Sequence, residues 1–220
     1  MSDADWKQYF NDKAAAFGGS VKTSDYFNEK SFFIRRDNTL QWLGELKDKE
    51  ILDAGCGVGA FSEPLVSKNM VCGVDFSEKS LEFAKQRGLK GYCGDLGQLP
   101  FEDGKFDLIL CIGVIQHIKE YKKIIVELGR VVKPGGTLLI ETLNKFSVQR
   151  KLLDFIGKSN KNFDLMFGKE ELKSLLVSLG FEDIEFMSMY HPMEFVTYSK
   201  NEGIINKYFS TSFAIKGRKR

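Results

Sequence analysis

From Glu50 onward the chain alternates short apolar runs with amphipathic stretches, and this alternation limits the possible folds more than any other feature. The apolar runs are continuously apolar, which is typical of parallel strands covered by helices on both faces. Such a succession predicts an α/β fold built on a parallel sheet. The predicted strands are 50–54, 70–75, 89–94, 106–113, 136–142, 181–190 and 211–216.

Amphipathic stretches between these strands predict helices. The clearest one places Ile124, Ile125 and Leu128 on one face and charged residues on the other. It is followed by Lys133-Pro134-Gly135-Gly136, a sequence typical of a helix end and a turn. The predicted helices are 59–68, 77–87, 119–132 and 169–179.

Two segments, 1–48 and 144–168, fall outside the alternation. The first is rich in Trp, Tyr and Phe, which need a surface to pack against, and we interpret it as one or two helices followed by a helix at 35–47. We expect both segments to fold over the carboxyl edge of the sheet, where ligands bind in such folds. The expected organisation is an N-terminal helical extension or lid (1–48) and an α/β domain (49–220), with 144–168 inserted at the ligand site.

Composition limits the class of partner. The net charge is +2, from 32 basic and 30 acidic residues, whereas a nucleic-acid binder usually carries a basic stripe. We interpret the one dense basic segment, 216–220, as a solvated tail, with an acidic partner as the alternative. No apolar run is long enough to span a bilayer, and the N-terminus does not resemble a signal peptide, so a cytoplasmic protein is expected. Composition does not specify an oligomeric state.

The four cysteines have no metal-ligand spacing and lie mostly in apolar stretches. We expect buried thiols in a reducing compartment.

The loop ILDAGCGVGAFSEP (51–64) predicts a cofactor site. Gly55, Gly57 and Ala60 match the G-x-G-x-x-A form of the dinucleotide fingerprint, and Asp75 follows about 20 residues later. The pattern alone therefore admits NAD. A pyrophosphate, however, favours N–H donors and positive charge, and here Asp53 precedes the glycines while no Lys or Arg occurs before Lys68.

Three carboxylates, those of Asp53, Asp75 and Asp95, lie at or just beyond the ends of the first three predicted strands. An acidic edge suits a cofactor with hydroxyls and a cationic end better than one with two phosphates. S-adenosylmethionine has a ribose, an ammonium, a carboxylate and a sulfonium. Its positive charges would be stabilised by nearby acids, and its carboxylate could accept from the N–H groups of the glycine loop.

The ordered motifs LDAGCGVGAFS, GVDFS, GDLGQLPFEDGKFDLIL and the segment from IQHI to RVVKPGGTLLI lie between Glu50 and Thr142. In this order they resemble the class I S-adenosylmethionine-dependent methyltransferases, in particular the small-molecule branch typified by ubiquinone and menaquinone biosynthesis methyltransferases. The resemblance implies a Rossmann-like sheet of seven strands, mostly parallel with an antiparallel last strand, and helices on both faces.

The resemblance also implies roles for residues around the methionine part of the cofactor. Asp53, Gly55 and Gly57 would surround it, and Cys56 would contribute its backbone. Cys111, at the end of the fourth strand, would present its carbonyl near the ammonium or the methyl group.

Further residues would hold the nucleoside. The resemblance implies that Asp75 accepts from both ribose hydroxyls and that Phe76 packs against adenine. Asp95 would accept from the adenine amino group, with Leu96 offering a backbone N–H. The alternatives are a core aromatic for Phe76, helix or turn caps for Asp75 and Asp95, and close helix packing for Gly59.

His117, in CIGVIQHIKEY after the fourth strand, is the candidate catalytic residue, and related families often carry a histidine here. A histidine with an ordinary pKa near 6.5 can act as a base at neutral pH. The alternatives are that it orients the acceptor or is structural. His191 is expected at a turn before Pro192, with lining of the acceptor pocket as the alternative, and Tyr9 and Tyr26 are expected in the core, with a lid as the alternative.

These features predict transfer of a methyl group from S-adenosylmethionine to a small-molecule acceptor that is partly apolar or aromatic, with oxygen ahead of nitrogen or carbon. In-line displacement needs chiefly alignment. The segment after the fourth strand lacks an acidic cluster that could chelate magnesium, so no metal is expected. The rival functions are an NAD(P)-dependent oxidoreductase and a non-catalytic S-adenosylmethionine-binding protein.

Overall fold

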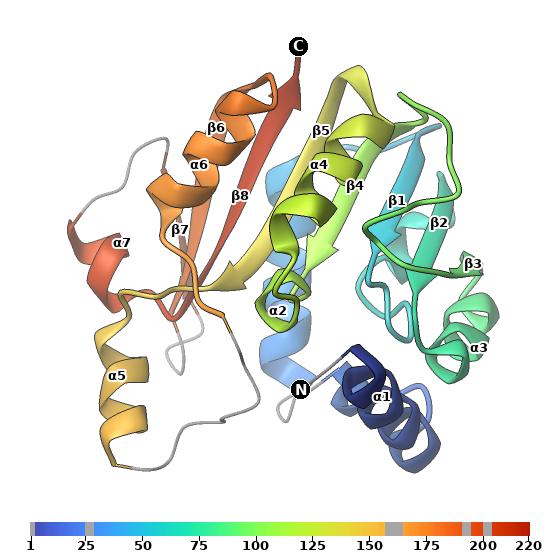
Figure 1. Ribbon diagram of the computed structural model, residues 1–220, viewed down its shortest axis with the longest axis horizontal. Helices are drawn as coiled ribbons and strands as arrows, with labels where there is room; N and C mark the ends of the chain where they lie inside the picture. Colours follow the sequence, from blue (N-terminus) through green and yellow to red (C-terminus); the bar gives the residue numbers. More distant parts are fainter. Residues whose placement is uncertain (1–2, 25–28, 157–164, 191–194, 200–203) are drawn as a thin grey trace.

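A computed structural model of the chain describes residues 3–24, 29–156, 165–190, 195–199 and 204–220 (Figure 1). One mixed sheet has the strand order β3-β2-β1-β4-β5-β8-β6-β7. The strands are β1 (Glu50–Ala54), β2 (Met70–Asp75), β3 (Lys90–Cys93), β4 (Phe106–Ile112), β5 (Val132–Leu143), β6 (Phe181–Tyr190), β7 (Phe195–Ser199) and β8 (Ser212–Lys219).

The first five strands are mutually parallel, and β8 runs antiparallel between β5 and β6. The prediction of seven strands, mostly parallel with an antiparallel last one, is confirmed. The structure adds β7, a short strand antiparallel to β6 at the edge of the sheet.

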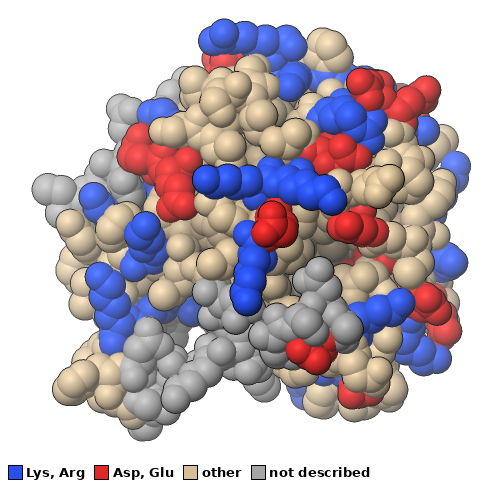
Figure 2. All heavy atoms as spheres, in the orientation of Figure 1, with Lys and Arg blue, Asp and Glu red and all other residues tan. Residues whose placement is uncertain are grey.

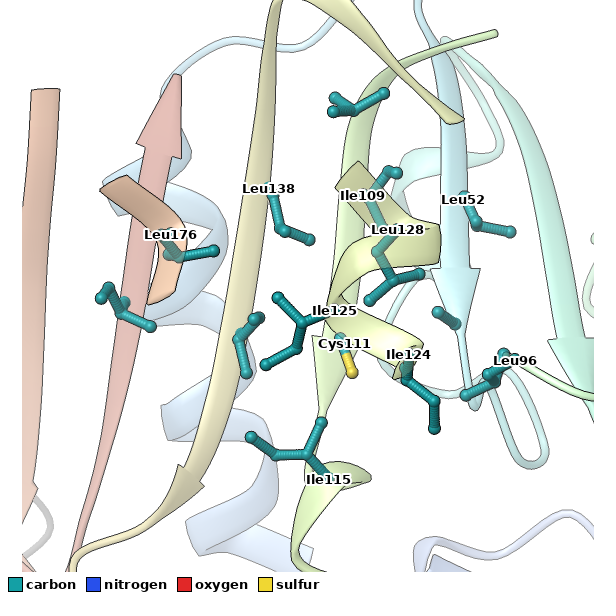
Figure 3. Packing of buried hydrophobic residues seen from close by; sticks show 14 of the residues in the cluster. Leu52, Leu96, Ile109, Cys111, Ile115, Ile124, Ile125, Leu128, Leu138 and Leu176 are labelled. Carbon is teal, nitrogen blue, oxygen red and sulfur yellow. The ribbon is translucent and has the colours of Figure 1, made fainter. Parts of the chain in front are cut away.

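Helices cover both faces of the sheet, as predicted. Helices α4 (Tyr121–Val131) and α6 (Lys169–Ser178) lie on one face, and α2 (Glu29–Leu43) lies behind the sheet in Figure 1. Apolar residues of α4 and α6 pack with Leu52, Ile109 and Leu138 of the strands (Figure 3). On the opposite face, Phe32 of α2 and Leu81 of α3 (Glu78–Gln86) belong to a second hydrophobic core, which they form with buried residues of the strands.

Two sequence predictions about local structure are wrong. The predicted helix at 59–68 is a series of turns with one short 3₁₀ helix, η2 (Glu63–Leu65). Gly59 has a φ of +76°, outside the α-helical region, and Ser62 turns inward to donate to a buried carboxylate, so a continuous helix does not form. The predicted turn at Lys133–Gly136 is instead the irregular start of β5, opposite a register shift between Phe106 and Leu108.

The basic segment at the C-terminus is also not a solvated tail. It forms the end of β8, where Lys216 pairs with Glu185 (3.3 Å) and Arg218 with Asp183 (2.8 Å). Its charges are balanced by acidic residues at the start of β6. Figure 2 likewise shows basic and acidic side chains interspersed over one face of the molecule.

The N-terminal segment forms α1 (Asp3–Phe17), η1 (Val21–Ser24) and α2, so the last helix begins and ends earlier than the predicted 35–47. The 144–168 segment contains α5 (Val148–Phe155), and α7 (Ile204–Phe209) precedes β8. Within the described residues, every helix is too short or too polar to cross a bilayer. Cys56, Cys72 and Cys111 are buried, as expected, whereas Cys93 is exposed.

A buried ion pair attaches α2 to the sheet. Arg35 of α2 donates through Nη1 to Oε1 of Glu141 on β5 at 2.6 Å, and both residues are buried. Burial lowers the pKa of Arg35 and raises that of Glu141, and each effect is opposed by the partner's charge. Removing two ions from water is costly, so the pair fixes the position of α2 without necessarily adding net stability.

We therefore expect Glu141→Leu to lower the free energy of unfolding by about 3–5 kcal/mol, because the buried guanidinium loses its counter-charge. The double variant Arg35→Met/Glu141→Leu should recover most of this loss. Urea unfolding of the wild type, both single variants and the double variant measures the coupling. Equal destabilisation of Glu141→Leu and the double variant would contradict this account of the pair.

Candidate active site

The predicted site residues gather at the carboxyl edge of the sheet, around the loop that follows β1. The N–H groups of Gly55 and Cys56 donate to the carbonyl of Val74 on β2, at 2.7 and 3.1 Å. Gly55 has a φ of +78°, and a Cβ there would lie 2.3 Å from Cγ2 of Val114, which follows β4. The loop therefore packs against the ends of both neighbouring strands and requires glycine at this position.

Gly59 allows close packing of α3, which is the alternative given for it in the sequence analysis. A Cβ at Gly59 would lie 3.0 Å from Cα of Ala84 in α3. This glycine lets α3 approach the loop closely.

Asp75, at the end of β2, holds the loop through its carboxylate. Oδ2 accepts from the N–H of Gly57 and Oδ1 from the N–H of Ser77, both at 2.8 Å. Burial raises the pKa of Asp75, and these backbone donors oppose the rise. Each carboxylate oxygen has two lone pairs, so these bonds leave acceptor capacity for a ligand's hydroxyls.

Asp53, at the end of β1, is also buried. The Ser62 hydroxyl donates to its Oδ2 at 2.6 Å. Burial raises the pKa of Asp53 to about 7, the Ser62 bond opposes this rise, and the negative charge of Asp75 adds to it. The two carboxylates thus form an electronegative site that a cation would stabilise.

Residues after β3 lie at the outer end of the same edge. Asp95 is exposed, and its Oδ1 accepts from the N–H of Gly97 at 2.7 Å, which is the turn-capping arrangement anticipated as the alternative. Leu96 is buried in the core beneath α4. The second carboxylate oxygen of Asp95 can contact a ligand while Oδ1 keeps this bond to the turn.

Both cysteines of the predicted site have buried side chains. The thiol of Cys111 lies among Ile124 and Ile125 of α4 (Figure 3), and burial raises its pKa to about 12. Burial also raises the pKa of Cys56 well above its ordinary value. Both thiols therefore remain protonated at neutral pH and leave only backbone atoms for a role toward a ligand.

His117 ends the 3₁₀ helix η3 (Ile115–His117), just after β4. Its ring centroid is 4.4 Å from that of Trp6 and 6.1 Å from that of Phe10, both on α1. Phe10 also meets Phe76, after β2, edge to face at 6.0 Å. The structure thus brings the predicted base and the predicted adenine-packing residue under one helix.

Trp6 and Phe10 are functional candidates that sequence reasoning missed. The aromatic density of 1–48 indicated a packing surface but did not distinguish these two rings from their neighbours. Their rings stack at 5.8 Å, and Tyr9 contacts each of them edge to face, 5.6 Å from Trp6 and 5.2 Å from Phe10. The predictions for Tyr26 and His191 fall outside the described residues.

The site suits a cofactor that carries positive charge. Two arginines contact the glycine loop. They donate to its backbone carbonyls, Arg87 to that of Val58 and Arg36 to that of Ala60. Burial raises the pKa of both Asp53 and Asp75, and a nearby cation would favour their ionised forms, so the site fits an ammonium or a sulfonium better than two phosphates. In the described ranges, His, Cys, Asp and Glu side chains form no group that could hold a metal ion.

Comparisons with known sequences find similar proteins. A family model described as a methyltransferase domain matches residues 52–140. A ubiquinone biosynthesis O-methyltransferase of Bordetella bronchiseptica is 28% identical over 193 residues, covering 78% of this chain and 80% of that protein. The protein of the same name from Coxiella burnetii is 28% identical over 185 residues, covering 76% of each chain.

Solved structures share the fold. An S-adenosylmethionine-dependent methyltransferase of Thermotoga maritima, a possible histamine N-methyltransferase, has a TM-score of 0.70 at 25% identity, covering 87% of this chain and 94% of that one. Magnesium protoporphyrin IX methyltransferase of Synechocystis, solved with S-adenosylhomocysteine, has a TM-score of 0.75 at 22% identity over the full length of both chains. Residues 52–140 thus match a methyltransferase domain, and the chain has the fold of S-adenosylmethionine-dependent methyltransferases.

The raised pKa of Asp53 predicts a pH dependence of stability. Its proton is retained in the folded chain up to about pH 7 but is lost near pH 4 on unfolding, so the free energy of unfolding should fall as pH rises between these values. Asp53→Asn removes this contribution, and urea unfolding between about pH 5 and about pH 8 should show a shallower decline.

Asp37→Asn, on the exposed side of α2, is the matched control and should keep the wild-type slope. An unchanged slope in Asp53→Asn would show that Asp53 ionises normally in the folded protein.

Proposed function

We propose that this protein is an S-adenosylmethionine-dependent methyltransferase that methylates an oxygen of a small, partly apolar acceptor without a metal ion, and that His117 is the base. The observation that carries the proposal is the position of His117 after β4, at the edge that holds Asp53, Asp75 and the glycine loop. The relatives named ubiquinone biosynthesis O-methyltransferases support oxygen as the acceptor atom.

The residues of the edge would divide the binding of S-adenosylmethionine among them. Asp75 would accept from the ribose hydroxyls, Phe76 would pack on adenine, and Asp95 with Leu96 would meet the base edge. Bound S-adenosylmethionine supplies a methyl group activated by its sulfonium.

Around the methionine part, the backbone of Gly55, Cys56 and Gly57 would approach the cofactor, and the charge of Asp53 would favour its ammonium. The carbonyl of Cys111 would lie near the ammonium or the methyl group. These residues hold the reactant in place, and alignment of this kind contributes on the order of 7–11 kcal/mol in well-oriented reactions.

His117 would remove the proton that a hydroxyl acceptor loses as its oxygen is methylated. Proton transfer to a positioned side chain contributes about 10²–10⁴-fold to a rate. The packing of its ring against Trp6 would limit its movement.

A screen with labelled methyl donor tests the reaction. Quinol, phenol, amino-sugar and lipid-precursor compounds are offered as acceptors, with and without EDTA. We expect O-methylated product from hydroxylated aromatic compounds at a rate that EDTA leaves unchanged. Methylation only at nitrogen or carbon, or loss of activity with EDTA, would contradict the proposal.

His117→Asn should lower kcat by about 10²–10⁴-fold while the Kd for S-adenosylhomocysteine stays within about twofold, because the base acts on the acceptor. The exposed neighbour Lys119→Ala is the matched control and should leave both values unchanged. The wild-type rate should also decline toward acid pH as the base becomes protonated, and the variant should lose this decline. A variant that keeps the wild-type pH profile would show that His117 only orients the acceptor.

A further inference from the structure

Helix α1 spans the ligand edge from the cofactor residues to the candidate base. At its centre, Phe10 meets Phe76, and Oδ1 of Asn11 accepts from the Ser77 hydroxyl at 2.7 Å. One turn earlier, Trp6 lies against His117. Figure 1 shows α1 beside the ends of β1, β2 and β4. Phe10 therefore contacts both Phe76 and His117, whereas the described ring contact of Trp6 outside its own helix is with His117.

Two contacts anchor the C-terminal end of α1. Arg87, which follows α3, donates to the carbonyl of Gly19 at 2.8 Å and to the carbonyl of Val58 in the glycine loop at 3.2 Å. The Thr23 hydroxyl donates to the carbonyl of Gly18 at 2.8 Å. The helix is thus fixed to the loop that binds the cofactor, and this fixes where Trp6 lies.

The indole N–H of Trp6 is a buried donor that no group in the described part of the chain accepts. Trp6 is only 3% exposed, and its Nε1 has no hydrogen-bond partner among the described residues. Buried donors almost always have partners, because leaving one unsatisfied costs about 1–3 kcal/mol. An unsatisfied donor beside the proposed base indicates that a bound molecule accepts its hydrogen bond.

We propose that Trp6 is a specificity-determining residue whose indole N–H donates a hydrogen bond to an oxygen of the methyl acceptor. This inference rests on the proposed function and adds the chemistry of the acceptor. The indole nitrogen is a donor only, so it selects a ligand atom with a lone pair. The surrounding rings of Tyr9, Phe10 and His117 provide aromatic surfaces that favour a planar ring over a flexible polar chain.

The arrangement assigns Trp6 to the acceptor and not to the cofactor. Its described ring contacts are with His117 and with its own helix, whereas Phe10 makes the contact with Phe76. The predicted acceptor is therefore an oxygen-substituted aromatic compound. One oxygen faces His117, and the same or a neighbouring oxygen accepts from Trp6.

The fluorescence of Trp6 provides a binding test that does not depend on turnover. The chain has two tryptophans, so in Trp42→Phe the emission comes from Trp6 alone. Trp42 lies elsewhere, where its Nε1 donates to Glu185. With S-adenosylhomocysteine bound, this variant is titrated with phenol, catechol, 4-hydroxybenzoate and 1-naphthol. We expect saturable change with at least one compound, and no change with any of them would overturn the proposal.

Trp6→Phe keeps an aromatic ring but removes the N–H. Measured by calorimetry, its Kd for the responding compound should rise about tenfold, while its Kd for S-adenosylhomocysteine stays within about twofold. Its midpoint of thermal unfolding without ligand should fall modestly, because Phe fills less of this buried position than Trp. Trp42→Phe is the matched control and should keep both wild-type Kd values.

An equal loss of affinity for S-adenosylhomocysteine would assign the N–H to the cofactor and overturn the inference. Failure of the proposed function is distinguishable, because the wild-type chain would then fail to transfer methyl to any oxygen acceptor in the screen.

Discussion

The bonds between the Asp75 carboxylate and the backbone of Gly57 and Ser77 hold the site together. One oxygen fixes the glycine loop after β1, and the other fixes the residue that caps α3, whose hydroxyl in turn accepts from the N–H of Ser80. The same carboxylate therefore joins the loop, β2 and α3 at the carboxyl edge of the sheet. Because it is buried beside Asp53, it also makes this edge electronegative. Shape and charge at the site thus have a common origin.

The second constraint is the position of α1. A Rossmann-like sheet leaves its carboxyl edge open, and here an N-terminal helix packs across part of that edge through ring contacts to Phe76 and His117. Arg87 ties the end of this helix to the glycine loop. The cofactor edge and the proposed acceptor site are therefore built on shared supports, although they come from distant parts of the sequence.

The strands and most helices could be predicted because their signals are local. The dense apolar runs marked β1, β2 and β6 closely, and the periodicity of Ile124, Ile125 and Leu128 marked α4. The acidic edge could also be predicted, since parallel strands bring Asp53 and Asp75 to one side of a sheet. Errors arose where tertiary contacts override local propensity. Ser62 turns inward to Asp53, and the basic C-terminal residues pair with acids of β6. The role suggested for Trp6 had no local signal, because it depends on where α1 packs.

The central claim is that a buried acidic edge makes the glycine loop select a sulfonium nucleoside over a diphosphate. Isothermal titration calorimetry of the chain with S-adenosylmethionine and with NADH tests this claim most directly. The charges at the site predict saturable binding of S-adenosylmethionine at one site per chain and no binding of NADH. Saturable binding of NADH without binding of S-adenosylmethionine would contradict it.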